Sequence, residues 1–244
     1  MNADTNPYVG PQTFTREDGN RFYGREREAG DLLALILAER LVLFYAQSGA
    51  GKSSLVNARL LPSLHDQGFE ILSAARVGWE IPEDINKAQI QNIYIFNLLL
   101  TINQELPEEL RQAPTVLAGL TLSQFLGGSG EQPASANDVA YKILPHILVV
   151  DQFEEIFTTH LDRWDHRAGF FTQLNQAMLD YPQLWVLLVM REDFVSALDP
   201  YAHLVSGRLR MRFYMERMGV DAALEAVQRP ATQANRPFTP VAAR

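Results

Sequence analysis

The chain has 244 residues, of which 47% are hydrophobic and 20% charged, and its formal net charge is -8. This composition fits one globular domain, or one domain with part of another, and the negative charge opposes non-specific attraction to nucleic acid or anionic lipid. The chain has no cysteine, which excludes disulfides, thiolate metal sites and a cysteine nucleophile. The polar N-terminus does not resemble a signal peptide, and no apolar run reaches the roughly 20 residues of a membrane span. We therefore expect a cytoplasmic protein.

Apolar runs alternate with amphipathic stretches along most of the chain. This alternation predicts an α/β fold, with a parallel sheet that carries helices on both faces. In chain order, the predicted strands are residues 41–45, 69–77, 147–150 and 185–190. The predicted helices are residues 27–39, 51–59 with an end near Pro62, 88–104, 117–125, 167–179 and 220–228. Residues 127–137, rich in Gly, Ser, Pro and Ala, predict a surface loop.

The stretch between the first predicted strand and the second helix matches a phosphate-binding P-loop. It consists of Ala46, Gln47, Ser48, Gly49, Ala50, Gly51, Lys52 and Ser53, with Ala46 where the first glycine is commonest. Small residues at 49–51 let backbone N–H groups surround the β-phosphate at the positive N-terminus of the helix. Lys52 is then expected to contact the β- and γ-phosphates, Ser53 to bind Mg²⁺ and Ser54 to contact the α-phosphate. The sequence predicts a site for ATP with Mg²⁺; the alternative is a glycine-rich turn followed by Lys-Ser by chance.

A second Mg²⁺ ligand is expected at the end of a neighbouring buried strand, and Asp151 directly follows the third predicted strand. The extra strand between this aspartate and the P-loop indicates the P-loop class whose members hydrolyse with a catalytic glutamate. In many such enzymes the acid directly follows the aspartate, whereas Gln152 stands there in this chain. We therefore expect hydrolysis to be slow, or to use Glu154 or Glu155. The alternatives are a helix N-cap for Asp151 and solvated first-turn carboxylates for the two glutamates.

Arg191 follows the apolar run 185–190. It would emerge at the carboxyl end of that strand, on the edge where ligands bind in open parallel sheets. A guanidinium group there can sense the γ-phosphate. The alternative is a surface ion pair with Glu192 or Asp193.

Seven motifs occur in the order in which one known family carries them. They are Tyr23-Gly24-Arg25-Glu26, the P-loop, Ala75-Arg76-Val77, Asn97-Leu98-Leu99-Leu100, the string from Asp151 to Phe157, Arg191-Glu192-Asp193-Phe194 and Gln228-Arg229-Pro230-Ala231. Together they resemble the first class of novel STAND NTPases, bacterial signal-transducing ATPases related to NACHT and apoptotic-ATPase modules. The resemblance runs from Pro7 to about Ala231. The string from Asp151 to Phe157 is more specific than the P-loop alone.

The resemblance also implies roles outside the P-loop. Gly24 and Arg25 would lie near the adenine and ribose, Arg191 would be the first sensor, and Pro230 would belong to a lid segment that touches the base. Each has a local alternative. Arg25 can pair with a neighbouring acid, Gly24 can turn the chain, and Pro230 can end the preceding helix.

The same resemblance divides the chain into an N-terminal lead, residues 1–26, a P-loop NTPase core, residues 27–216, and the start of a helical lid, residues 217–244. Family members continue into a winged-helix region and a repeat-type sensor, and many carry an effector domain. We therefore expect a fragment or truncated product with an incomplete lid.

Other chemistries find less support in the sequence. No Asn-Lys-x-Asp guanine reader follows the P-loop, which favours ATP over GTP. Two histidines and two aspartates precede the predicted helix 167–179: His160, Asp162, Asp165 and His166. We expect them to be solvated residues before the start of that helix rather than a metal site. The alternating arginines Arg208, Arg210 and Arg212 predict an edge strand with one charged face, and a nucleic-acid-binding stripe is the alternative.

Our leading hypothesis is a nucleotide-operated signalling switch, of the kind used in bacterial stress or phage defence. ATP and Mg²⁺ would order the module, the ATP form would self-assemble, and slow hydrolysis would reset it. Expected partners are the nucleotide and further copies of the chain or other domains of a larger protein, with no membrane. The alternatives are a motor-like ATPase that acts on nucleic acid or protein, and a degenerate scaffold that binds no nucleotide.

Overall fold

The computed structural model describes residues 7–8, 10, 12–82, 85–127 and 144–239. Within them, five parallel strands form one sheet in the order β2-β3-β4-β1-β5. The strands are β1 (Leu41–Ala46), β2 (Glu70–Ala75), β3 (His146–Val150), β4 (Leu184–Arg191) and β5 (Arg212–Met215). The predicted α/β fold is confirmed. Strands β1 and β3 are not neighbours in the sheet, because β4 lies between them.

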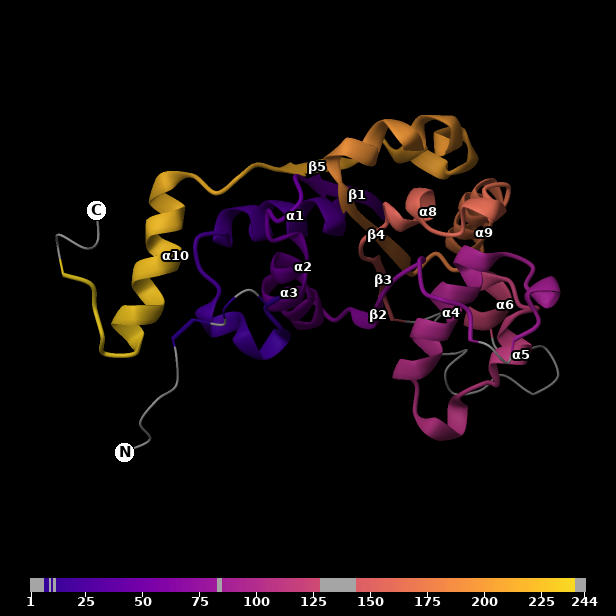
Figure 1. Ribbon diagram of the computed structural model, residues 1–244, viewed down its shortest axis with the longest axis horizontal. Helices are drawn as coiled ribbons and strands as arrows, with labels where there is room; N and C mark the ends of the chain where they lie inside the picture. The colour runs from indigo at the N-terminus through magenta and orange to yellow at the C-terminus, as the bar shows by residue number, and fades with distance from the viewer. Residues whose placement is uncertain (1–6, 9, 11, 83–84, 128–143, 240–244) are drawn as a thin grey trace.

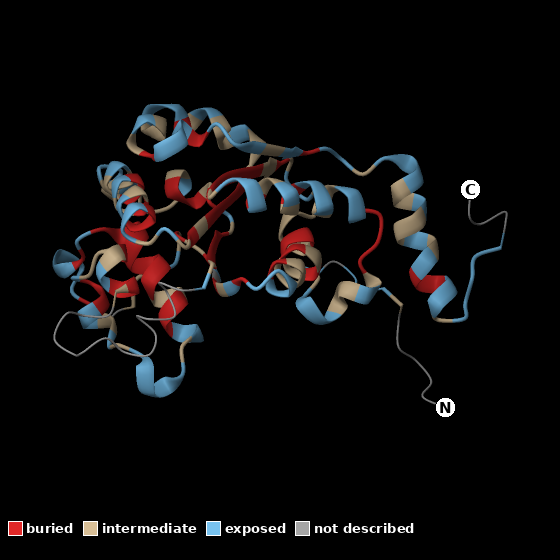
Figure 2. Cartoon of the chain, turned by 180° about the vertical axis from the view of Figure 1, so that it is seen from behind, coloured by how far each residue is buried: buried red, intermediate tan, exposed pale blue. Residues whose placement is uncertain are grey.

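The central strands are apolar along their whole length because both faces of the sheet are covered. Alternate side chains of each strand enter different hydrophobic clusters, as the two-residue period of a strand requires. In β1, Leu43 belongs to one cluster and Phe44 to the other; in β3, Leu148 and Val149 divide in the same way. The sheet thus separates two cores (Figure 2).

Helices cover both faces of the sheet (Figure 1). One core includes residues of α4, α5, α6, α8 and α9, and the other includes residues of α1, α2 and α3. The α-helices are α1 (Glu26–Ala38), α2 (Lys52–Leu55), α3 (Leu61–Asp66), α4 (Ile93–Glu105), α5 (Pro114–Leu117), α6 (Leu122–Leu126), α8 (Glu155–Thr158), α9 (His166–Asp180) and α10 (Val220–Gln233). The 3-10 segments are η1 (Arg16–Arg21), η3 (Lys87–Gln89), η4 (Glu108–Leu110), η5 (Leu161–Arg163), η6 (Glu192–Leu204) and η7 (Ser206–Leu209). Among the described residues, no helix has both the length and the apolar character to cross a bilayer.

The helix after the P-loop does not end near Pro62, and that prediction is wrong. The helical path runs from α2 through a π-helical segment, η2 (Val56–Leu60), into α3, which ends at Asp66. A proline inside an α-helix loses one N–H donor and its ring clashes with the carbonyl four residues earlier. The wider π turn directly before Pro62 changes that register, and Pro62 occupies the first turn of α3, where prolines are tolerated.

Two further predicted helices differ at their ends. The segment 88–104 contains a short 3-10 turn and then α4, which begins at Ile93 because the Asn92 side chain accepts the N–H groups of Tyr94 and Ile95. The segment 117–125 is divided between α5 and α6, and Thr121 caps α6. Of the predicted loop 127–137, residues 128–137 lie outside the described residues.

The C-terminal part departs from prediction at the arginines and at Pro230. Only Arg212 lies in the edge strand β5, since Arg208 adopts a left-handed conformation (φ 53°) in η7 and Arg210 follows that segment. Helix α10 does not end before Pro230 but continues to Gln233, with Pro230 in its last turn. The helix lies apart from the sheet, beyond an extended connection from β5 (Figure 1).

Candidate functional site

The P-loop connects the buried strand β1 directly to α2. Gly49 and Gly51 have φ angles of 73° and 90°, a left-handed region that favours glycine. A Cβ atom at either position would meet nothing within 4 Å, so backbone conformation rather than crowding requires glycine there. The Lys52 Nζ donates to the carbonyl oxygens of Ala46 and Gln47, at 3.2 Å each. The loop thus folds around its own lysine.

Ser53 and Asp151 meet at the carboxyl edge of the sheet. The Ser53 hydroxyl donates to the Asp151 Oδ2 at 2.6 Å, and the Asp151 backbone N–H donates to the Ala75 carbonyl at 2.8 Å. A hydroxyl and a carboxylate are oxygen donors of the kind that Mg²⁺ binds. The pair therefore fits the Mg²⁺ that P-loop NTPases use, with room for phosphate oxygens in the adjoining cleft.

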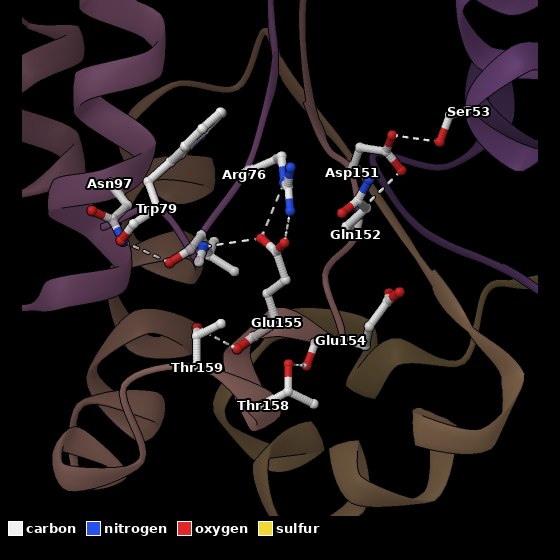
Figure 3. A network of polar contacts seen from close by, with 12 residues as sticks. Ser53, Arg76, Trp79, Asn97, Asp151, Gln152, Glu154, Glu155, Thr158 and Thr159 are labelled. Carbon is white, nitrogen blue, oxygen red and sulfur yellow. Dashed lines mark hydrogen bonds and ion pairs between the residues drawn. The ribbon is translucent and has the colours of Figure 1, made fainter. Parts of the chain in front are cut away.

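The turn that follows Asp151 sends its two glutamates in different directions. Gln152 adopts a left-handed conformation (φ 52°), and the Phe153 N–H donates to the Val189 carbonyl of β4 at 2.8 Å. Glu154 lies toward the P-loop, and its Oε2 accepts the Arg191 backbone N–H at 3.2 Å. Glu155 is buried and turns toward the end of β2, where it pairs with Arg76 (Figure 3).

Arg191 lies at the end of β4, as predicted, and its side chain has local partners. The guanidinium group donates to both oxygens of Asp193, at 3.0 and 2.6 Å, and lies 5.4 Å from the ring centroid of Phe194. The ion pair with Asp193 was the predicted alternative. Arg191 also lines an open cleft, so an anion bound there would compete with Asp193 for the guanidinium group.

An open cleft of about 480 Å³ joins these groups. It is lined by Gln12, Thr13, Ser48, Gly49, Gly51, Lys52, Ser53, Ser54, Asp151, Gln152, Glu154 and Arg191. The structure therefore gathers most of the predicted P-loop and strand-end residues in one place, and leaves Glu155 outside. Sequence reasoning missed Gln12 and Thr13, because no motif marks them; the nearby Phe14 N–H donates to the Ser54 hydroxyl at 3.2 Å.

Burial and charges of both signs act on Lys52 in the cleft. Partial burial lowers the pKa of Lys52, and the nearby Glu154 and Asp151 carboxylates oppose that shift. Arg191 adds a second positive charge that lowers the pKa of Lys52 further. Asp193, which pairs with Arg191, also raises the pKa of Lys52, so the cleft holds cations and carboxylates together.

The predicted residues Gly24, Arg25 and Pro230 do not line the cleft. Gly24 (φ 80°) packs so closely on α10 that a Cβ atom there would lie 2.5 Å from the Ala222 carbonyl oxygen. Arg25 is buried and pairs with Glu28, the predicted alternative, while its Nε has no hydrogen-bond partner among the described residues. Pro230 is buried in α10.

Two further P-loop residues make contacts outside the cleft. Gln47 accepts a hydrogen bond from Arg217, in the connection between β5 and α10. Ala50 packs against the core that includes α1, α2 and α3.

The sequence profile of one family, described as Novel STAND NTPase 1, matches residues 7–243. This chain belongs to that family. It is an NTPase module with a P-loop fold, as the seven motifs predicted, and such modules bind nucleotides. A search of curated proteins returned no match.

Solved structures of Walker-type proteins share the fold. One is the Walker-type ATPase of Pyrococcus abyssi, with a TM-score of 0.59 at 18% identity over 96% of this chain and 63% of that one. Another is the ORC2 protein of Aeropyrum pernix in its ADP form, with a TM-score of 0.57 at 14% identity over 94% of this chain and 55% of that one. The present chain thus spans less than two thirds of the length of either protein.

Proposed function

We propose that the module binds ATP with Mg²⁺ and hydrolyses it slowly, as the switch element of a signalling ATPase. The observation that carries the proposal is the convergence of Lys52, the Ser53–Asp151 pair, Glu154 and Arg191 on one cleft. These groups come from three neighbouring parallel strands and the helix after β1. They supply a phosphate cradle, oxygen ligands for a cation, a carboxylate and a guanidinium group.

In this proposal Ser53 and Asp151 hold Mg²⁺, which would neutralise charge on the β- and γ-phosphate oxygens. Lys52 exchanges its two loop carbonyls for those phosphates, and Ser54 contacts the α-phosphate. Arg191 leaves Asp193 to contact the γ-phosphate. The contacts that the phosphates replace are two hydrogen bonds from the Lys52 ammonium group to backbone carbonyls and a half-exposed ion pair, and the phosphates give the same cations charge-assisted contacts in return.

We assign the role of general base to Glu154. Its carboxylate lines the cleft, whereas Glu155 is bound to Arg76 and to the Gly78 N–H. Gln152 occupies the place directly after Asp151 and has no group that can accept a proton as readily as a carboxylate. A base that sits three residues after the aspartate, and already accepts the Arg191 N–H, is consistent with slow turnover.

Calorimetry with ATP and Mg²⁺ tests the binding step. Lys52→Ala should weaken ATP binding on the order of 10–100-fold, because a charge-assisted contact to phosphate is lost. Lys87→Ala removes an exposed lysine that does not line the cleft and should bind ATP like the wild type. Equal affinities for the Lys52→Ala protein and the wild type would overturn the proposal.

Single-turnover hydrolysis, with protein in excess over labelled ATP, tests the chemical step and detects slow rates. Glu154→Gln should bind ATP normally and hydrolyse it at least about 100-fold more slowly, the usual loss for a general base. Wild-type hydrolysis in Glu154→Gln would contradict the assigned base. Rapid turnover that rises further with nucleic acid or protein would favour a motor instead of a switch.

We also propose that the described parts of the N-terminal lead and of the lid, residues 12–26 and 217–239, close on the base, with Gly24, Arg25 and Pro230 on the adenine side. Support comes from the close packing of Gly24 on α10, the helix that carries Pro230. Pro230→Ala should reduce the preference for ATP over GTP and leave the affinity for inorganic triphosphate unchanged. Equal loss for all three ligands would contradict an adenine-side role.

The switch itself predicts self-association that depends on the nucleotide. Sedimentation of the Glu154→Gln protein, which should hold ATP unhydrolysed, is expected to show larger species with ATP than with ADP. Identical sedimentation with both nucleotides would overturn the switch and leave the ATPase proposal intact.

A further inference from the structure

The turn from Asp151 to Glu155 is held from both sides by the neighbouring strands. On the β2 side, the Asp151 N–H donates to the Ala75 carbonyl. On the β4 side, the Phe153 N–H donates to the Val189 carbonyl, and the Phe153 ring is fully buried against Phe170 and Phe171, with ring centroids 5.5 and 5.8 Å away. These contacts fix the first half of the turn.

The second half of the turn is fixed by a clamp on the Glu155 carboxylate. Arg76, the first residue after β2, donates to it through Nε at 3.2 Å and also through Nη2. The Gly78 backbone N–H donates to the same carboxylate at 3.1 Å. A bidentate guanidinium contact with a third donor orients a carboxylate closely, and Figure 3 shows these contacts together.

Gly78 packs directly against the Glu155 side chain, with no space for a side chain of its own. A Cβ atom at position 78 would lie 2.6 Å from the Glu155 Oε2 and 2.8 Å from its Cβ. Trp79, the next residue, lies under the Arg76 guanidinium group, 5.1 Å from ring centroid to Cζ. Gly78 thus contacts the Glu155 carboxylate and Trp79 contacts the Arg76 guanidinium group, so residues 76–79 hold both partners of the ion pair outside the cleft.

We propose that Arg76 and Glu155 are positioning residues that aim Glu154 at the cleft. This inference rests on the proposed function, in which Glu154 is the base. Adjacent side chains diverge from the backbone, so a clamp on Glu155 toward β2 fixes the opposite direction for Glu154, toward Arg191 and Lys52. Without the clamp, the left-handed Gln152 and the following residues can relax, and Glu154 loses its place.

The contacts distinguish this role from catalysis by Glu155 itself. Glu155 does not line the cleft, and its carboxylate is already bound by Arg76 and the Gly78 N–H. A general base must reach the water whose proton it accepts, within about 3.2 Å or through one water molecule. Glu154 is placed to do so, and Glu155 acts on it only through the turn.

Single-turnover hydrolysis and ATP affinity, measured on the whole chain, test the inference. Arg76→Gln and Glu155→Gln should each slow hydrolysis roughly 10–100-fold, the scale of loss when a reacting group is displaced by about 1 Å, with ATP affinity within about twofold of wild type. The double variant should be no slower than either single one. Arg76→Lys should recover part of the rate. Arg163→Gln, which removes another half-exposed arginine that is paired elsewhere, should hydrolyse ATP normally.

The decisive comparison uses the Glu154→Gln background. There, Arg76→Gln should cause no further loss, because the group that it positions has gone. Wild-type rates in Arg76→Gln, or an equal further loss in the Glu154→Gln background, would overturn the positioning role while the base assignment stands. Wild-type rates in Glu154→Gln would overturn the base assignment, and no detectable hydrolysis by the wild type would overturn both proposals.

Discussion

The carboxyl edge of the sheet and helix α10 are built in different ways. On the sheet side, Asp151, Glu154 and Arg191 stand at the ends of buried strands and are fixed by backbone hydrogen bonds between β2, β3 and β4. By contrast, α10 lies apart from the sheet (Figure 1), and contacts with the N-terminal segment help to hold it. They include the packing of Gly24 on Ala222, the Tyr8 hydroxyl on the Val227 carbonyl, and Arg229 over the Tyr23 ring.

In the proposed function, the sheet edge is the preformed part of the site and α10 is the adjustable part. Groups that act on phosphates need fixed geometry, which dense packing provides. A segment that closes on a ligand must come from the low-stability part of a protein, with few buried apolar contacts. In α10 only Pro230 and Ala231 are buried, and Val220 is 77% exposed. Substitutions should therefore have large global effects on the sheet side and small local effects around α10.

Phe153→Ala should give the largest effect. Its ring is fully buried between the turn and α9, and removal of such a side chain costs about 3–5 kcal/mol of unfolding free energy. Urea denaturation would measure this loss. Phe213→Ala, in the edge strand β5, where the ring is only half-buried, should cost less. Equal losses would contradict the contrast between the sheet centre and its edge.

Gly24→Ala should release α10 with little effect on the sheet. Both the positive φ and the close Ala222 carbonyl oppose a Cβ atom, and strain of this kind costs on the order of 1–3 kcal/mol. Hydrogen exchange should rise across residues 220–233 and stay constant in β3 and β4. Gly30→Ala, a helical position with open space, should instead raise stability by about 0.5–1 kcal/mol. Unchanged exchange in α10 would show that Gly24 does not hold this helix.

Arg229→Gln should loosen α10 by less. The variant loses both the stacking on Tyr23 and the ion pair with Glu225, at 2.9 Å, and exposed contacts of these types contribute about 0.5–1 kcal/mol each. Exchange in α10 should therefore rise a fewfold. Glu225→Gln keeps the stacking and serves as the control, with a smaller rise. If the two variants behave alike, the Tyr23 contact contributes nothing.

A pH series on the nucleotide-free protein should reveal the smallest effect. Burial lowers the pKa of Lys52 in the folded state, so the folded protein loses this proton at a lower pH than the unfolded chain does. Below the pKa of Lys52 in the folded state, the partly buried charge lowers the free energy of unfolding. This free energy rises again as the pH increases toward 10.5, the ordinary lysine value. Lys52→Met should lack this gain in denaturation between pH 8 and 10.5. Parallel pH profiles would contradict the lowered pKa.

The sequence predicted the sheet and the P-loop because their signals are local. A buried parallel strand is a continuous apolar run, so the strand before Asp151 was recognisable, and the glycines at 49 and 51 were recognisable from their spacing. The sequence did not predict that Glu154 lines the cleft while Glu155 is buried against Arg76, because Arg76 lies far from both glutamates in the chain. Two adjacent glutamates look alike in a sequence, and only the folded chain shows which side chain each of them contacts.

The other misses have the same kind of cause. Pro62 predicts a helix end only if the preceding turn is α-helical, and the π turn at 56–60 removes that condition. Gln12 and Thr13 belong to no pattern, and reach the cleft because Phe14 bonds to Ser54. Pro230 lies inside α10, which continues to Gln233, so this proline does not mark the end of the helix.

The position of β1 in the sheet also governs when the site can form during synthesis. Leu41 pairs with Val186 and Leu43 with Arg212, so both neighbours of the P-loop strand are made long after the loop itself. Contacts between residues so distant in sequence form slowly, because a long loop must close first. The nascent chain consequently holds a complete P-loop sequence well before it holds a nucleotide site. A bound nucleotide can stabilise the finished module but cannot guide the early steps of its folding.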